Sequence, residues 1–148
     1  MKVNFNKTEI PEISQKLLDK ILKMNNKCAK VVAFSGELGA GKTTLIQELA
    51  RRLGIKENII SPTFVIMKIY KINPSSIYYS YFKKLIHIDA YRLDSPIELL
   101  KIRWHELQSN KDNLIIIEWP EKVREYVSSS VLRVALTHVD DINRFIEF

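Results

Sequence analysis

Cysteine and long apolar runs are almost absent from this sequence. Cys28 is the only cysteine among 148 residues, which excludes an internal disulfide and a metal site built from paired thiolates. No apolar run approaches the roughly 18 residues that a membrane-spanning helix needs. Residues 1–10 are polar and lack the apolar core of a secretory signal. These absences predict a soluble protein that makes no membrane contact, with the reducing cytoplasm as its compartment.

Glycine is scarce too, and its distribution is uneven. The chain has four glycines, and three of them lie within residues 36–43, Gly-Glu-Leu-Gly-Ala-Gly-Lys-Thr. This segment fits the G-x-x-x-x-G-K-[ST] pattern of a phosphate-binding loop. Residues 29–35 before it are typical of a buried strand and residues 43–53 after it of a helix, which is the context that the motif requires. A chance match has a probability of roughly 1% in a chain of this size, so the sequence predicts nucleotide binding.

The residue types of the loop explain how it would hold phosphate. Its glycines let the backbone amides turn inward, and the following helix adds free amides and the positive end of its dipole. We expect Lys42 to reach the β and γ phosphates, and Thr43 to place its hydroxyl on a magnesium ion that bridges them. The guanine-specifying pattern Asn-Lys-x-Asp is absent, since residues 110–113 read Asn-Lys-Asp-Asn. The expected cofactors are therefore ATP or ADP, in preference to GTP, with Mg²⁺.

Length and composition suit one domain. With 46% apolar residues, a chain of this length can build a full core, so we expect a single P-loop ATPase domain over residues 1–148. The net charge of +6 is compatible with an acidic or nucleic-acid partner or with a solvated, lysine-rich surface. We prefer the second interpretation because the basic residues are spread along the chain.

Further elements follow from hydrophobic periodicity and turn residues. We predict strands at 3–5, 65–72, 85–89, 114–119, 131–136 and 144–148. Helices are predicted at 11–24, from the Ser95–Glu98 capping box to about Leu107, and, as a short one, at 121–127. This order predicts an α/β P-loop fold with a mainly parallel central sheet and antiparallel edge strands.

Residues 73–84 separate two of these strands and carry an aromatic cluster at 77–82, Ile-Tyr-Tyr-Ser-Tyr-Phe. We interpret them as a long hairpin that partly covers itself, in preference to a membrane-touching or base-stacking surface. The serines at 128–130 are interpreted as a linker.

Two of the predicted strands end in an acid, Asp89 and Glu118. Carboxyl ends of parallel strands meet at one edge of a sheet, where P-loop enzymes need an acid to hold magnesium directly or through water. Either acid alone could merely end a strand at the solvent, and the pattern leaves open which one is the direct ligand. His87 points to the same face as Asp89 and is more typical of a packed core residue than of a catalyst. Trp119 either covers the site or fills the core.

Four sequence blocks, in a fixed order, resemble one family. They are 36–44 (Gly-Glu-Leu-Gly-Ala-Gly-Lys-Thr-Thr), 61–64 (Ser-Pro-Thr-Phe), 87–93 (His-Ile-Asp-Ala-Tyr-Arg-Leu) and 117–121 (Ile-Glu-Trp-Pro-Glu). Together they resemble the TsaE family, bacterial ATPases of tRNA threonylcarbamoyladenosine biosynthesis. The resemblance implies an ATPase that sustains the turnover of the TsaB and TsaD proteins, its partners, with tRNA contacted indirectly or weakly.

The resemblance also implies roles for single residues, carried over by position. Magnesium is assigned to Thr43 and Glu118, and hydrolysis to Asp89 together with Lys42. The nucleotide-binding residues are Thr8, Gly36, Gly39, Ala40, Gly41, Lys42, Thr43, Thr44, Trp119 and Arg144.

The sequence departs from the family in two places and leaves two other functions open. Residues 73–84 are longer than the short acidic hairpin expected of the family, and Arg103-Trp104-His105 stands where a glycine is common. One alternative is a nucleotide-dependent binding switch without useful turnover. The other is a small-molecule kinase. Such kinases usually carry an arginine-rich helical lid, and the corresponding part of this sequence has two predicted strands instead, which counts against this alternative.

Overall fold

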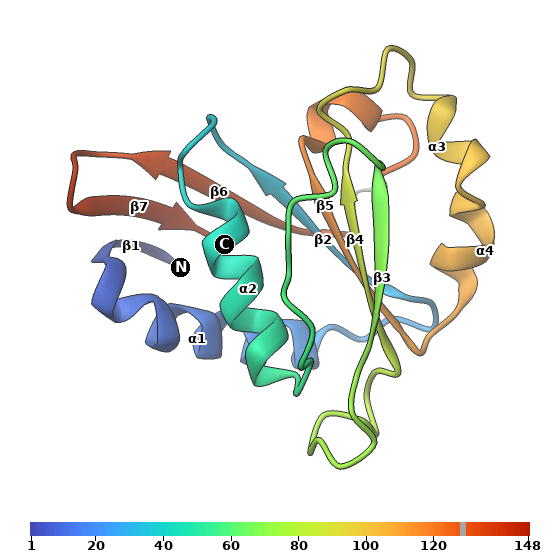
Figure 1. Ribbon diagram of the computed structural model, residues 1–148, viewed down its shortest axis with the longest axis horizontal. Coiled ribbons are helices and arrows are strands. Elements are labelled where there is room, and N and C mark those ends of the chain that lie inside the picture. The colour runs from blue at the N-terminus through green and yellow to red at the C-terminus, as the bar shows by residue number, and fades with distance from the viewer. Residues whose placement is uncertain (128–129) are drawn as a thin grey trace.

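The structure is a computed structural model that describes residues 1–127 and 130–148. Within these residues, seven strands form one mixed sheet in the order β1-β7-β6-β2-β5-β4-β3 (Figure 1). The strands are β1 (Lys2–Asn6), β2 (Lys30–Ser35), β3 (Met67–Lys71), β4 (Lys84–Asp89), β5 (Asn113–Glu118), β6 (Leu132–His138) and β7 (Asn143–Glu147). The helices are α1 (Ile10–Lys23), α2 (Lys42–Arg52), α3 (Glu98–Lys101) and α4 (Trp104–Ser109), with the 3-10 helices η1 (Lys7–Glu9) and η2 (Pro120–Val123).

The centre of the sheet is parallel and its edges are antiparallel. Strand β2 pairs in parallel with β5 and β6, and β5 pairs in parallel with β4. The edge pairs β3–β4, β6–β7 and β1–β7 are antiparallel. The predicted α/β fold, with a mainly parallel centre and antiparallel edges, is confirmed.

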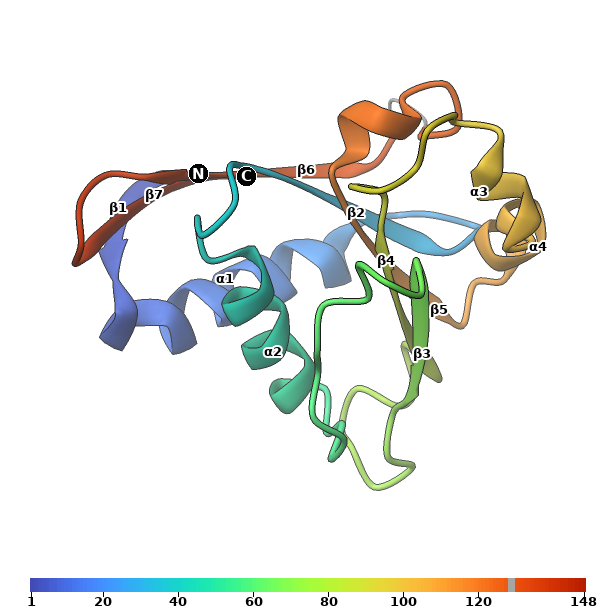
Figure 2. The ribbon, with the colours of Figure 1, turned by 45° about the horizontal axis from the view of Figure 1, so that its top comes forward.

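Helices cover the two faces of the sheet. Helices α1 and α2 lie on one face, and α3 and α4 lie on the other (Figure 2). Side chains alternate between the two faces along β5, and they are apolar on both. Leu114 and Ile116 pack toward α1 and α2, whereas Ile115 and Ile117 pack toward α3 and α4. A strand buried on both sides reads as one continuous apolar run, which is why β5 was predictable.

The prediction of one continuous helix from the Ser95–Glu98 capping box to Leu107 is wrong. It is interrupted between α3 and α4, where Arg103 adopts a left-handed conformation with φ 61°. The resulting turn lets Trp104 become buried against the sheet. A left-handed position is also where a glycine would be unstrained.

The strand predicted at 65–72 begins two residues later, at Met67. The backbone amides of Val65 and Ile66 both donate to the carbonyl oxygen of Pro62, at 3.0 and 2.6 Å, and Ile66 has φ 67°. A turn therefore occupies 62–66, so Phe64 and Val65 are exposed.

The interpretation of residues 73–84 as a long hairpin is confirmed. Strands β3 and β4 pair from Lys71 opposite Lys84 onward, so the chain between them is the hairpin loop. Phe82 is buried in it, while Ile77 and Tyr81 remain exposed. Of the predicted helix 121–127, only residues 121–123 are helical, as part of η2. The predicted linker 128–130 includes residues 128 and 129, which lie outside the described residues. In the part of the chain that the structure describes, no helix is long and apolar enough to cross a membrane.

Glycine at position 103 should give a more stable protein than alanine. A non-glycine residue pays an energetic penalty at positive φ, so we expect Arg103→Gly to unfold with a free energy about 1 kcal/mol higher than Arg103→Ala. The alanine variant is the control, because both substitutions remove the exposed ion pair between Arg103 and Glu106. Urea denaturation measures the difference. Equal stabilities would show that the αL conformation carries no strain.

Candidate nucleotide-binding site

The loop between β2 and α2 requires glycine for steric and conformational reasons. Gly36 has φ 143°, and a Cβ at that position would overlap the carbonyl oxygen of Leu136 in β6. Gly41 has φ 99° and immediately precedes the first residue of α2. The backbone therefore passes from β2 to α2 through the glycine-rich residues 36–41, with the amides of the first turn of α2 facing the loop.

Lys42 is the first residue of α2, and its side chain reaches back to the loop. Its Nζ atom donates to the carbonyl oxygens of Gly36 at 2.7 Å and Glu37 at 3.0 Å, and it lies 4.5 Å from the ring centroid of Trp119. Burial lowers the pKa of Lys42 from its usual value, while the carboxylates of Glu118 and Asp89 act in the opposite direction. The ammonium group is thus held close to the loop and beside two acids.

Both acids lie at the carboxyl ends of their strands, next to the loop, as predicted. Asp89 of β4 and Glu118 of β5 stand opposite each other in the parallel register, and Glu118 is also opposite Phe34 of β2. Each acid is only 3% exposed. Charged groups this deeply buried need polar partners.

The two acids obtain those partners in different ways. Glu118 Oε1 lies 2.7 Å from Nε2 of the buried His87. Asp89 Oδ2 accepts hydrogen bonds from Thr63 Oγ1 at 2.6 Å and Ser61 Oγ at 3.0 Å. The first contact joins two central strands, whereas the second joins a strand to the segment before β3.

One cavity of about 480 Å³ brings most of the predicted residues together. Its lining includes Gly39, Gly41, Lys42, Thr43, Thr44, Asp89, Glu118 and Trp119. Trp119 follows β5 in a left-handed conformation with φ 58°, and its ring lies 5.0 Å from that of Tyr91. It borders the cavity and also packs against the α3 and α4 face of the core, so both interpretations of this residue hold.

A smaller cavity of about 210 Å³ lies on the other side of the loop and shares Gly39, Gly41 and Thr44 with the first. Arg144 lines it together with Phe5, because the pairing of β1 with β7 places these two residues opposite each other. Predicted Ala40 lines it too. Phe5 and Lys7 were not recognised from the sequence, since no local pattern signals a pairing between the two ends of the chain.

Two predicted nucleotide-binding residues are placed differently from the rest. Thr8 is exposed, its hydroxyl donates to Asn6 Oδ1 at 2.6 Å, and it is not among the residues that line either cavity. Gly36 shapes the loop and accepts from Lys42 without lining either cavity.

The side-chain groups at the larger cavity that could ligate a metal suit magnesium. They are oxygens, from the Thr43 hydroxyl and the Asp89 and Glu118 carboxylates. Within residues 1–127 and 130–148, no group of three or more His, Cys, Asp or Glu side chains forms a closed metal cage. Mg²⁺ usually takes one or two carboxylates and completes its shell with phosphates and waters, so the residues present fit this ion.

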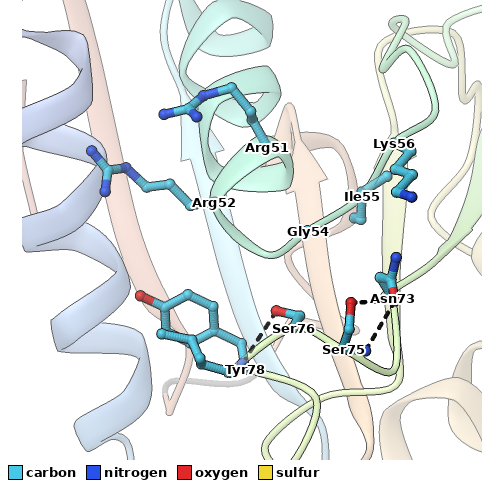
Figure 3. Close-up of a pocket in the computed structure, with 10 residues that line it drawn as sticks. Arg51, Arg52, Gly54, Ile55, Lys56, Asn73, Ser75, Ser76 and Tyr78 are labelled. Carbon is cyan, nitrogen blue, oxygen red and sulfur yellow. Dashed lines mark hydrogen bonds between the residues drawn. The ribbon is translucent and has the colours of Figure 1, made fainter.

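A larger hollow of about 580 Å³ lies between the end of α2 and residues 73–78 (Figure 3). Its arginines are already paired. Arg51 donates twice to Glu48, and Arg52 donates to Gln15 and to the carbonyl oxygen of Pro11. The hollow also lies at the negative end of the α2 dipole, which disfavours anions. It is where the hairpin packs against α2, and it offers no comparable phosphate site.

The parallel sheet, the glycine-rich loop between β2 and α2, and the acids at the ends of β4 and β5 define a P-loop NTPase fold. The model of the family described as threonylcarbamoyl adenosine biosynthesis protein TsaE matches residues 6–146. The chain belongs to the TsaE family.

Individual relatives support this assignment. The tRNA threonylcarbamoyladenosine biosynthesis protein TsaE of Rickettsia felis is 35% identical over 134 residues, which are 90% of this chain and 72% of that protein. The protein of the same name from Haemophilus influenzae is 33% identical over 129 residues, 86% of this chain and 75% of the other. The crystal structure of YdiB from Bacillus subtilis is similar with a TM-score of 0.65 and 25% identity, covering 99% of this chain and 83% of that one.

Replacing Lys42 should weaken ATP binding. Lys42→Ala removes a cation at the loop, and hydrogen bonds to charged groups contribute enough for a loss of roughly 10- to 100-fold in affinity. Isothermal titration calorimetry measures it. Lys30→Ala is the matched control, because Lys30 is a partly buried lysine at the opposite end of β2 whose Nζ donates to the carbonyl oxygen of Leu22. Unchanged affinity in Lys42→Ala would contradict the assignment of the loop.

Proposed function

We propose that this protein binds and hydrolyses ATP with Mg²⁺, and that its hydrolysis serves tRNA threonylcarbamoyladenosine biosynthesis together with the TsaB and TsaD proteins. The observation that carries the proposal is the convergence of Lys42, Asp89 and Glu118 on one cavity at the N-terminus of α2. The names of the relatives support the pathway. The partnership with TsaB and TsaD rests on the family resemblance.

Phosphate binding is the task of the loop. Lys42 exchanges its bonds to the carbonyl oxygens of Gly36 and Glu37 for bonds to phosphate oxygens, and the amides at the start of α2 add further donors. Thr43 and Glu118 would hold Mg²⁺, which would supply positive charge against the phosphates. The smaller cavity beside the loop receives the base, with Phe5 and Arg144 on its walls.

Hydrolysis is assigned to Asp89. Its carboxylate lines the same cavity as Lys42, and a carboxylate there orients the attacking water by accepting its hydrogen bond. Oδ1 also accepts from the backbone amide of Tyr91 at 2.9 Å. The side chain therefore stands at the junction between β4 and the loop that follows it.

A nucleotide-dependent binding switch is the second candidate. Ser61 and Thr63 bond to Asp89, so this segment can respond to the γ phosphate without any turnover. The test measures phosphate release from ATP by the protein alone and with purified TsaB and TsaD. We expect release that the pair accelerates. ATP that is bound but never consumed under either condition would favour the switch.

The metal role can be tested by titration. Thr43→Ala and Glu118→Gln should each reduce the gain in ADP affinity that Mg²⁺ produces, by about 10-fold, because both side chains are proposed to bind the ion or a water in its shell. Calorimetry in MgCl2 and in EDTA measures this gain. An unchanged magnesium response in Glu118→Gln would transfer the metal role to Asp89.

Substitutions of the two acids should also differ in their effects on ATP binding and on turnover. Asp89→Asn is expected to bind ATP within a few-fold of the wild type but to lose at least about 100-fold in kcat with the TsaB and TsaD pair present, since orienting water matters only in the transition state. Nucleotide affinity is followed by Trp119 fluorescence and turnover by phosphate release. Asp94→Asn, at an exposed acid in the same loop, is the control. Loss of ATP binding in Asp89→Asn, or normal hydrolysis, would refute the assignment.

A further inference from the structure

His87 and Glu118 form a buried pair beside the phosphate loop. His87 lies on β4, Glu118 ends the neighbouring parallel strand β5, and His87 Nε2 is 2.7 Å from Glu118 Oε1. The His87 side chain is fully buried and that of Glu118 is 4% exposed. We propose that His87 is a positioning residue that holds the Glu118 carboxylate in the orientation needed to bind Mg²⁺ with the nucleotide.

The proposal assigns a direction to this hydrogen bond. A carboxylate that binds Mg²⁺ is ionised and only accepts hydrogen bonds, so the proposal places the shared proton on His87 Nε2. The other ring nitrogen, Nδ1, is buried and has no hydrogen-bond partner in the described part of the chain. The contact with Glu118 therefore fixes both the tautomer and the orientation of the ring.

The unpaired Nδ1 argues against a purely structural role for His87. A buried polar atom without a partner is destabilising, and an apolar side chain such as that of Leu85, on the same face of the same strand, would avoid the penalty. An apolar side chain would not supply the donor to Glu118. That donor is the property that distinguishes histidine at this position.

The hydrogen bond to His87 engages one of the two carboxylate oxygens of Glu118. Oε1 accepts from His87, and no residue among 1–127 and 130–148 donates to Oε2. Glu118 lines the cavity that also contains Thr43, so Oε2 is the oxygen available to Mg²⁺ or to a water in its shell. Because β4 and β5 are central strands buried on both faces, the pair is preorganised rather than assembled on binding.

The proposal rests on the metal role of Glu118 in the proposed function. Its test measures ADP affinity by calorimetry across a MgCl2 titration and in EDTA for the wild type, His87→Leu and His87→Gln. Leucine fills the space without a donor, whereas glutamine carries an amide N–H at a similar reach from the backbone. We expect His87→Leu to raise the half-maximal Mg²⁺ concentration about 10-fold and His87→Gln to stay within about 3-fold. ADP affinity in EDTA should not change in either variant.

Two further variants separate positioning from stability. Ile86→Ala removes a buried side chain from the opposite face of β4, so it should lower the melting temperature and leave the Mg²⁺ titration unchanged. In a Glu118→Gln background, His87→Leu should have no additional effect on the titration, since its influence passes through Glu118.

The outcomes discriminate between this proposal and the function on which it rests. A folded His87→Leu protein that titrates like the wild type overturns the positioning role and leaves the proposed function intact. Equal losses in His87→Leu and His87→Gln, or a loss that persists in the Glu118→Gln background, overturn it as well. If wild-type ADP affinity is the same in MgCl2 and EDTA, the metal role of Glu118 fails and the proposal with it.

A measurement on the unmodified protein keeps the proposal testable if His87→Leu does not fold. Nitrogen-15 NMR of the His87 imidazole reports which ring nitrogen carries the proton. A proton on Nε2 supports the proposal, and a proton confined to Nδ1 overturns it.

Discussion

The burial of one basic and two acidic side chains at the carboxyl ends of the parallel strands is the constraint on which this structure depends. Lys42, Asp89 and Glu118 are each 5% exposed or less, and burying such groups is unfavourable unless each finds polar partners. Lys42 finds two loop carbonyls and the face of Trp119. The loop, the ends of β4 and β5, and the segment before β3 must therefore all be in place together.

This requirement also orders the sheet. The phosphate loop has to leave the carboxyl end of a central strand and enter a helix, and the acids have to arrive on strands running in the same direction. Parallel pairing of β2 with β5 and of β5 with β4 achieves this. The antiparallel strands β7 and β1 lie farther out in the sheet, and through Phe5 and Arg144 they add a wall to the smaller cavity.

The parts that could be predicted from the sequence are those with a local physical cause. The phosphate loop, α1, β2, β4 and β5 follow from glycine spacing and hydrophobic periodicity, and the edge position of both acids follows from the strand ends. The break at Arg103 and the turn at Ile66 depend on positive φ values at non-glycine residues, which no local pattern encodes. His87 shows the same limit. Its burial was expected from a lone histidine in an apolar strand, but its bond to Glu118 depends on which strand lies beside β4.

The different anchoring of the two acids has a consequence for how the site communicates with the surface. Glu118 is tied to His87 within the sheet, so it moves only if the central strands move. Asp89 is tied to Thr63, which precedes the exposed Phe64, and the ring of Phe64 lies 4.4 Å from the guanidinium carbon of Arg92. A change in the hydrogen bonds of Asp89 therefore acts on two surface segments that contact each other, one before β3 and one after β4. The buried chemistry and the exposed rim of the cavity are thus linked through the side-chain hydrogen bonds of Asp89.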